Sequence, residues 1–330
     1  MTYKKPLEIK LQLTEECNFD CGFCFNKQSS PLNKKGISEN DAKKIVSRVA
    51  EEGIRGIRFT GGEPLLHPSL PKLLSQAKEL GLKTTLNTNA SLLNKQTAKT
   101  ISQNADTVLV SLHELPLNKS TQKSLSLLSN GDCVLRAATI LTRENIKNLE
   151  EFHKAVSQNF TQWVLLRQIP NQLNKSPVNH EDLQLAIQKI RQFNSSRAKK
   201  DYFLIENALP FCCSNPEQVR EVALGGIHED GHSSLFVDTA SKIKPSYFLE
   251  VPLGNALQDS FLDAWNSPFM KRMNSLEFIP EPCHKCNYVL KCMAGSRFSA
   301  LFTGNSLYAF DPLAMPSNLF SYQKKALGNS

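Results

Sequence analysis

Apolar and polar residues alternate along the first 195 residues in two rhythms. Short apolar runs predict strands, at 7–13, 56–60, 83–86, 107–111, 133–138 and 163–167. Between these runs apolar residues recur at helical spacing, which predicts helices at 38–52, 70–80, 94–103, 119–129, 145–157 and 181–194. Because strand and helix alternate throughout, we expect parallel strands joined by crossover helices, in an α/β fold built on a partial (β/α)6 TIM-like barrel.

The alternation stops near residue 205. The remainder has turn-forming sequence such as Asn215-Pro216, short strands on either side of Ser241, and one helix at 260–274. We therefore expect two domains, a barrel at 1–205 and a small α+β domain at 206–330. Functional groups of such barrels lie on the loops after the strands. Polar motifs fall at those places, namely a cysteine loop after 7–13, residues 61–64, residues 87–89 and Ser111.

The composition is that of a globular enzyme, with 40% hydrophobic and 21% charged residues among 330. A run of about 18 apolar residues, which a membrane span needs, does not occur. The first ten residues lack the apolar core of a signal peptide, so we expect a cytoplasmic protein with no membrane partner. The net charge of +8 comes from scattered basic residues, and this disfavours nucleic acid as a partner.

The nine cysteines are an odd number and cluster at 17/21/24, 133, 212/213 and 283/286/292. A secreted disulfide framework would usually be smaller, whereas tight triplets in a reducing compartment indicate metal or cluster ligation. Cys17, Cys21 and Cys24 directly follow the first predicted strand. Three thiolates at this spacing can hold three corners of a [4Fe–4S] cluster and leave the fourth iron open. Structural zinc takes four ligands, and no fourth lies nearby, so we expect a cluster.

These residues carry a family resemblance. The segment from Cys17 to Asn26, with Phe23 before the third cysteine, resembles the signature of the radical S-adenosylmethionine (SAM) superfamily. Residues 61–64 resemble the second motif of that family. The resemblance implies that SAM binds the open iron and that one electron cleaves it to a 5′-deoxyadenosyl radical. It also implies that Phe23 packs near adenine and that the SAM ammonium group is bound by residues of the second motif, namely Gly61, Gly62, Glu63 and Pro64.

Four further residues are singled out by the same resemblance. Asn87, in Asn87-Thr88-Asn89-Ala90, stands at the end of the third strand, where it contacts either SAM or only the turn. Ser111 ends the fourth strand, a position that meets the ribose or carboxylate of SAM in this family. Arg136 on the fifth strand suits the SAM carboxylate if it points into the barrel, and Arg167 on the sixth is its counterpart; a solvated face is the alternative for both.

The second triplet, Cys283, Cys286 and Cys292, resembles the SPASM region of many radical SAM enzymes. A full SPASM domain holds two auxiliary clusters, but Ser246, Ser296 and Ala314 stand where it has cysteines. The resemblance therefore implies a degenerate SPASM/twitch-like domain with one auxiliary [4Fe–4S] cluster. Zinc, with a ligand such as His284, or no metal at all are the alternatives.

The fourth ligand of this auxiliary cluster stays open between substrate, solvent, Asp311, Cys212 and Cys213. A thiol hydrogen donor and a buried core thiol are the alternative interpretations of the adjacent cysteines. Two other polar groups, His113-Glu114 and the turn at 228–232, fit acid–base or metal roles. Surface loops are the interpretation that we favour for both.

The sequence thus predicts a radical SAM enzyme that removes a hydrogen atom from a C–H bond. A ribosomally synthesised peptide is the first expected substrate, helped by a separate recognition protein because the barrel starts near residue 7. The alternatives are a small metabolite near the auxiliary cluster, such as a sugar, nucleoside or amino-acid derivative, and a non-catalytic Fe–S scaffold. The expected electron donor is a flavodoxin or ferredoxin.

Overall fold

The computed structural model describes residues 3–24, 26, 36–117, 119–128, 131–160, 162–170, 178–195 and 202–317. In this part of the chain ten strands form one sheet, in the order β10-β9-β8-β1-β2-β3-β4-β5-β6-β7. The strands are β1 (Glu8–Thr14), β2 (Gly56–Gly61), β3 (Lys83–Thr88), β4 (Thr107–Ser111), β5 (Val134–Leu141), β6 (Gln162–Arg167), β7 (Tyr202–Ile205), β8 (Ser234–Val237), β9 (Lys242–Lys244) and β10 (Gly254–Asn255). Strands β1 to β7 pair in parallel, as expected for crossover connections.

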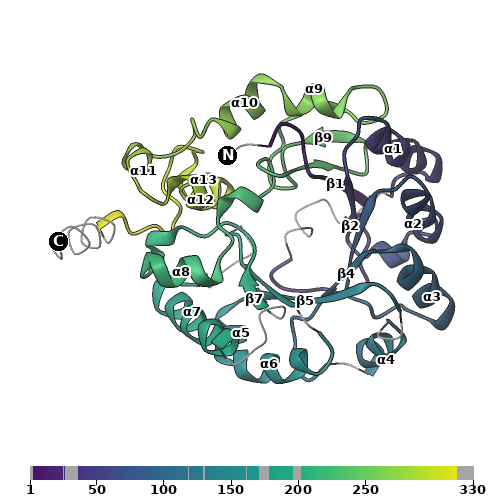
Figure 1. Cartoon of the computed structure of the whole chain (residues 1–330), viewed down its shortest axis with the longest axis horizontal. Helices are drawn as coiled ribbons and strands as arrows, with labels where there is room; N and C mark the ends of the chain where they lie inside the picture. Colours follow the sequence, from purple (N-terminus) through teal and green to yellow (C-terminus); the bar gives the residue numbers. More distant parts are fainter. Residues whose placement is uncertain are drawn as a thin grey trace.

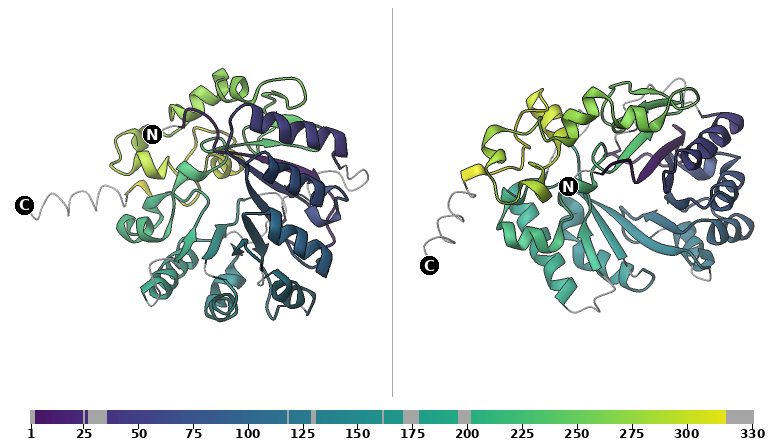
Figure 2. Two further views of the ribbon diagram at one scale, coloured as in Figure 1. Left: turned by 45° about the vertical axis from the view of Figure 1, so that its right-hand side comes forward. Right: turned by 45° about the horizontal axis from the view of Figure 1, so that its top comes forward.

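The helices lie outside the curved sheet, and α8–α13 complete the ring between α7 and α1 (Figures 1 and 2). They are α1 (Glu39–Glu51), α2 (Leu70–Glu79), α3 (Lys95–Asn104), α4 (Lys119–Leu128), α5 (Arg143–Lys147), α6 (Leu149–Ser157), α7 (His180–Ser195), α8 (Pro216–Val222), α9 (Phe261–Trp265), α10 (Pro268–Asn274), α11 (Glu281–His284), α12 (Val289–Cys292) and α13 (Arg297–Gly304). None of the described helices is long and apolar enough to cross a membrane.

Local signals explain why the predicted elements form. Ser38 caps α1 by accepting a hydrogen bond from the Asp41 amide (3.1 Å), and the buried face of that helix includes Ile45 and Val49. Gly53 follows the helix with φ +67°, a conformation that favours glycine. Apolar residues at helical spacing also form the buried faces of α2 and α3. The predicted elements of the barrel are confirmed within a few residues.

Two predicted helices are broken, and one strand was not expected. The helix predicted at 145–157 divides at Asn148 into α5 and α6. The helix predicted at 260–274 divides because Ser267 caps a new helix that starts at Pro268. Residues 202–205 form β7, which pairs in parallel with β6.

Strands from the predicted C-terminal domain extend the barrel sheet. β8 pairs in parallel with β1, and β9 returns antiparallel to β8 through a turn at Ser241. β10 then pairs antiparallel with β9. The segment after residue 205 therefore shares one sheet with the barrel, and it brings its loops to the edge of the barrel interior.

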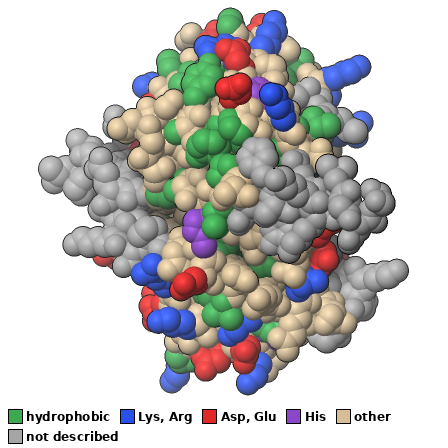
Figure 3. Space-filling model, turned by 90° about the vertical axis from the view of Figure 1, so that its left-hand side faces the viewer, with side chains coloured by type: hydrophobic (Ala, Val, Ile, Leu, Met, Phe, Trp, Pro, Cys, Tyr) green, Lys and Arg blue, Asp and Glu red, His purple; other side chains and the backbone are tan. Residues whose placement is uncertain are grey.

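The C-terminal helices lie on the left-hand side of Figure 1. Figure 3 views the molecule from that side, where hydrophobic side chains gather near the centre of the face between groups of both charges. Among the large hydrophobic side chains described in this part of the chain, Leu290 and Tyr308 are the most exposed.

Candidate active site

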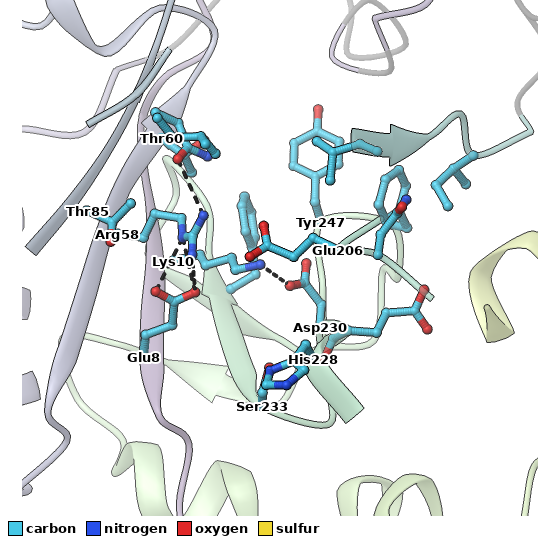
Figure 4. Close-up of a pocket in the computed structure, with 18 of the residues that line it drawn as sticks. Glu8, Lys10, Arg58, Thr60, Thr85, Glu206, His228, Asp230, Ser233 and Tyr247 are labelled. Atoms are coloured by element: carbon cyan, nitrogen blue, oxygen red, sulfur yellow. Dashed lines mark hydrogen bonds and ion pairs between the residues drawn. The ribbon is translucent and has the colours of Figure 1, made fainter. Parts of the chain in front are cut away.

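The barrel encloses a cavity of about 600 Å³ (Figure 4). It extends from residues at the start of β1 to β3, such as Glu8 and Lys83, to residues near their carboxyl ends, such as Gly61 and Asn87. Loops after β7 and before β8 close one side. The cavity lies where a barrel of parallel strands places its functional groups.

One wall of the cavity carries paired charges from β1, β2 and the loops beside β8. Arg58 donates to Glu8 at 3.0 Å and to the Oδ1 atom of Asn87 at 3.5 Å. Lys10 forms an ion pair with Asp230, and Figure 4 shows both pairs pointing toward one another. Burial alone would lower the pKa of Arg58, but the carboxylates of Glu8, Glu206 and Asp230 raise it above its usual value. Arg58 therefore stays charged.

The opposite wall is apolar. Leu109, Ala138 and Val164 form a small buried cluster with Leu166, separate from the main core behind the sheet. Ala138 on β5 stands level with Val164 on β6, and Leu109 on β4 lies two positions before the residue level with Ala138. Leu109 and Leu166 line the cavity. The barrel interior therefore has a charged side and an apolar side.

The cysteine loop is held directly against the glycine turn at 61–64. The Gly62 amide donates to Thr14 O and the Glu63 amide to Glu16 O, both at 2.7 Å. A Cβ atom at Gly62 would lie 2.0 Å from Glu16 O, so only glycine allows this approach. The structure thus brings together the two motifs that the sequence singled out, which are 37 residues apart from Cys24 to Gly61.

Glu63 connects the glycine turn to the end of β3. Its carboxylate accepts hydrogen bonds from the Thr88 hydroxyl (2.6 Å), the Asn89 amide (2.7 Å) and the Leu65 amide (3.0 Å). It is buried, and burial raises its pKa. Its role in this structure is to organise the loop ends, and direct contact with the SAM ammonium group stays a prediction. Pro64 begins the single 3-10 turn that follows.

Phe23, between the second and third cysteines of the loop, lines the cavity. Its ring packs edge-on against His113, with centroids 4.9 Å apart. Burial lowers the pKa of His113 to about 4, so the imidazole is neutral, and its Nδ1 atom accepts from the Ile140 amide. His113 is therefore half-buried against Phe23 rather than fully solvated, whereas Glu114 is exposed as expected.

The arginines predicted to face SAM have protein partners. Arg136 donates to Glu206 at 3.1 Å, and it sits level with Leu109, two positions before Ser111 on the neighbouring strand. Arg167 is 3% exposed and donates to Asp311 at 2.6 Å. Each guanidinium is thus paired with one carboxylate, while its Nε atom has no hydrogen-bond partner among the described residues, so contact with the SAM carboxylate stays a prediction. Ser111 ends β4 and is partly buried, beside the apolar wall.

The polar turn at 228–232 was interpreted as solvated; this holds for the exposed His228 and is wrong for the buried Glu229 and His232. His228, Glu229 and Asp230 line the cavity, and His232 is buried. Glu229 is 6% exposed, and its Oε2 atom has no hydrogen-bond partner among the described residues. Burial raises the pKa of Glu229 to about 8, although Ser296 donates a hydrogen bond to it. A neutral carboxylic acid thus faces the cavity at neutral pH.

This buried acid predicts how stability depends on pH. Between pH 4.5, the ordinary pKa, and about 8, the folded chain keeps the Glu229 proton and the unfolded chain has lost it. The free energy of unfolding should therefore fall as pH rises through this window, by up to about 1.4 kcal/mol per pH unit from this group. Glu229→Gln should remove that slope in urea unfolding series at several pH values. The exposed Glu144→Gln is the control, and a slope unchanged in Glu229→Gln would contradict the prediction.

The second cysteine triplet gathers around another, smaller cavity. Cys283, Cys286 and Cys292 line it with Cys212 and Ala314. None of the nine cysteines forms a disulfide. Within the described ranges, no three His, Cys, Asp or Glu side chains are placed around one metal ion.

The serines that stand in SPASM cysteine positions have other partners. Ser246 and Ser296 are fully buried. The Ser246 hydroxyl accepts from the Phe248 amide at 2.8 Å, and the Ser296 hydroxyl caps α13 by accepting from the Ser299 amide at 3.2 Å. Both positions are thus part of the hydrogen-bonded interior of this region.

Comparison with known proteins gives the family context. The sequence profile described as Radical SAM superfamily matches residues 11–162. The GTP 3′,8-cyclase of Chlorobaculum tepidum is 36% identical over 115 residues, which are 34% of this chain and 34% of that protein. The chain spans only 34%, 60% and 38% of the length of the first three curated relatives that it matches.

Two solved structures share the fold over nearly the whole chain. Streptococcus suis SuiB bound to the precursor peptide SuiA has a TM-score of 0.75 at 20% identity, covering 95% of this chain and 77% of SuiB. Native anSMEcpe with bound AdoMet has a TM-score of 0.74 at 16% identity, covering 98% of this chain and 99% of that protein. The α/β, TIM-like barrel predicted from the sequence is confirmed.

Proposed function

Because the chain belongs to the radical SAM superfamily, we propose that it is an enzyme that cleaves SAM reductively and removes a hydrogen atom from a C–H bond of its substrate. The observation that carries this proposal is the cysteine loop, which docks on the glycine turn beside a cavity inside the barrel. When bound, the [4Fe–4S] cluster and SAM supply a 5′-deoxyadenosyl radical.

The loop residues fit a cluster that faces the cavity. Cys17, Cys21 and Cys24 form no disulfide and are partly exposed. The Cys24 amide donates to Cys21 O (3.1 Å), which tightens the loop, and the Phe19 amide donates to the Cys17 Sγ atom (3.4 Å). Hydrogen bonds from backbone amides to sulfur are a common means of stabilising cluster thiolates. Cys17, Cys21 and Cys24 would hold the cluster.

The two walls of the cavity have different roles in this proposal. Leu109 and Leu166 on the apolar wall would pack around the substrate carbon that reacts. Their side chains carry no O–H or N–H group, and they keep water away from that carbon. The polar wall, with Arg58 and Asn87, orients the polar part of a substrate. The buried acid Glu229 can donate a proton to a substrate oxygen or take one back.

We propose a peptide as the substrate, modified at one residue that enters the barrel. SuiB, which shares the fold, is bound to a precursor peptide. Because SAM would share this cavity of about 600 Å³, the remaining space suits a single peptide residue rather than a longer segment. A separate recognition protein would then hold the remainder of the peptide.

A small metabolite is the second candidate, and the similarity to a GTP 3′,8-cyclase favours it. The charges in the cavity argue for a sugar, nucleoside or amino-acid derivative. Lys10, Arg58 and Arg136 are each paired with a carboxylate of the barrel, so little positive charge is left for a triphosphate. The electron would come from a cytoplasmic flavodoxin or ferredoxin.

The experiment compares the two substrate classes on the reconstituted, reduced enzyme. A deuterated peptide encoded beside the gene is tested against a panel of deuterated nucleosides, sugars and amino acids. A true substrate should raise 5′-deoxyadenosine formation by about tenfold or more and transfer deuterium into it. Transfer from a panel member alone would overturn the peptide proposal, and transfer from the peptide would establish it.

A further inference from the structure

Four cysteines, not three, line the small C-terminal cavity. Cys212 comes from the turn after β7, and Cys283, Cys286 and Cys292 come from α11, α12 and the loop between them. We propose that Cys212 is the fourth ligand of the cluster at this site, so that four thiolates of the chain close its coordination. The proposal rests on the proposed function only in taking the chain to be an iron–sulfur enzyme, and it carries forward the auxiliary cluster expected at these cysteines.

The segment that lacks a ligand lies directly over Cys212. Ala314 lines the same cavity, and its methyl group cannot bind iron. The amide of the next residue, Met315, donates to the Cys212 Sγ atom at 3.3 Å. Residue 314 and the Cys212 sulfur therefore lie at the same corner of the site. Cys212 supplies there the sulfur atom that Ala314 lacks.

Backbone amides point at three of the four sulfurs. Besides the bond to Cys212, the Tyr288 amide donates to the Cys286 Sγ atom at 3.4 Å and the Phe211 amide to the Cys292 Sγ atom at 3.3 Å. The last of these bonds joins the turn that carries Cys212 to the triplet. Such N–H···S bonds set the charge and potential of cluster thiolates.

The other two side chains that were candidates for the fourth ligand, Cys213 and Asp311, are disfavoured by their surroundings. Cys213 is 3% exposed but lies outside the cavity lining, in the main core. Asp311 accepts from Arg167 (2.6 Å), from the Ser296 amide (2.8 Å) and from the Leu313 amide (2.9 Å), so both its oxygens are bonded. Asp311 also does not line the small cavity, so we do not propose it as the ligand.

A closed site changes what the second cluster can do. The lining of this cavity and that of the barrel cavity share no residue. An iron atom with a full set of thiolates offers no position to substrate. The substrate must then be held by side chains in the barrel, and the C-terminal cluster is an electron carrier or a brace for residues 206–315.

The test uses the full chain with Cys17, Cys21 and Cys24 all replaced by alanine, which leaves only the C-terminal site. This background cannot cleave SAM, so its iron readout is independent of the proposed function. We expect about four iron atoms per chain and the Mössbauer spectrum of a [4Fe–4S] cluster. Adding Cys212→Ala should lower the iron at least about twofold or yield a three-iron cluster, whereas Cys213→Ala, its matched control, should change neither.

A rescue variant separates loss of a ligand from loss of fold. In the Cys212→Ala chain, Ala314→Cys should restore about four iron atoms, because residue 314 lines the same cavity. Unchanged iron and spectra in Cys212→Ala would overturn the proposal. So would zinc in place of iron in the chain that lacks only Cys17, Cys21 and Cys24, or equal losses in Cys212→Ala and Cys213→Ala without rescue.

Discussion

Cys17→Ala is expected to lower 5′-deoxyadenosine formation at least about a thousand-fold. Two remaining thiolates cannot hold a cubane on a loop that is partly exposed to water. The iron content should fall from about eight toward about four atoms per chain, because the C-terminal site is not touched. Both quantities are measured on anaerobically reconstituted protein with a chemical reductant.

Cys133→Ala is the matched control for this change. Cys133 is a buried cysteine before β5, far along the chain from both triplets. Its replacement should leave iron content and SAM cleavage near wild type. Turnover that persists in Cys17→Ala, or an equal loss in Cys133→Ala, would contradict the assignment of the first cluster.

Asp311→Ala should destabilise the protein by about 3–5 kcal/mol, since it leaves the buried charge of Arg167 without a partner. The pair joins the end of β6 to the segment after α13, and both side chains are almost fully buried. The amides of Ser296 and Leu313 lose their acceptor as well. Urea unfolding of the wild-type and variant holoenzymes measures the difference.

An exposed pair supplies the comparison. Glu221→Ala breaks the ion pair between Glu221, whose side chain is 54% exposed, and Arg191, whose side chain is 36% exposed. The free energy of unfolding should fall by less than about 1 kcal/mol. Arg167→Met combined with Asp311→Ala should recover part of the loss, because no unpaired charge is then buried. An Asp311→Ala chain as stable as Glu221→Ala would refute this account of the ion pair.

The barrel could be predicted because its signals are local. The strand at 107–111 is an apolar run between two helical patterns, and it was predicted to the residue. α1 was bounded by the cap at Ser38 and by Gly53. The pairing of β8 with β1 could not be predicted, because partners more than 200 residues apart leave no local pattern. The four-residue β7 is too short to show a period.

Part of the candidate active site could also be predicted from local sequence patterns. The cysteine and glycine motifs are local, and the structure puts them in contact. The turn at 228–232 is polar and looked solvated, because sequence polarity does not tell a surface turn from one that faces a cavity. Glu229 and Asp230 were missed on that account. The partners of Arg136 and Arg167 likewise come from distant segments, at Glu206 and Asp311.

The central claim is that the loop of Cys17, Cys21 and Cys24 presents an open iron to SAM. Electron–nuclear double resonance on the reduced wild-type protein, with SAM carrying a ¹⁵N-labelled amino group, tests it most directly. The account predicts a ¹⁵N coupling that appears with SAM and is lost in Cys17→Ala, but not in Cys133→Ala. A reduced cluster whose spectrum shows no such coupling while SAM is bound would contradict it.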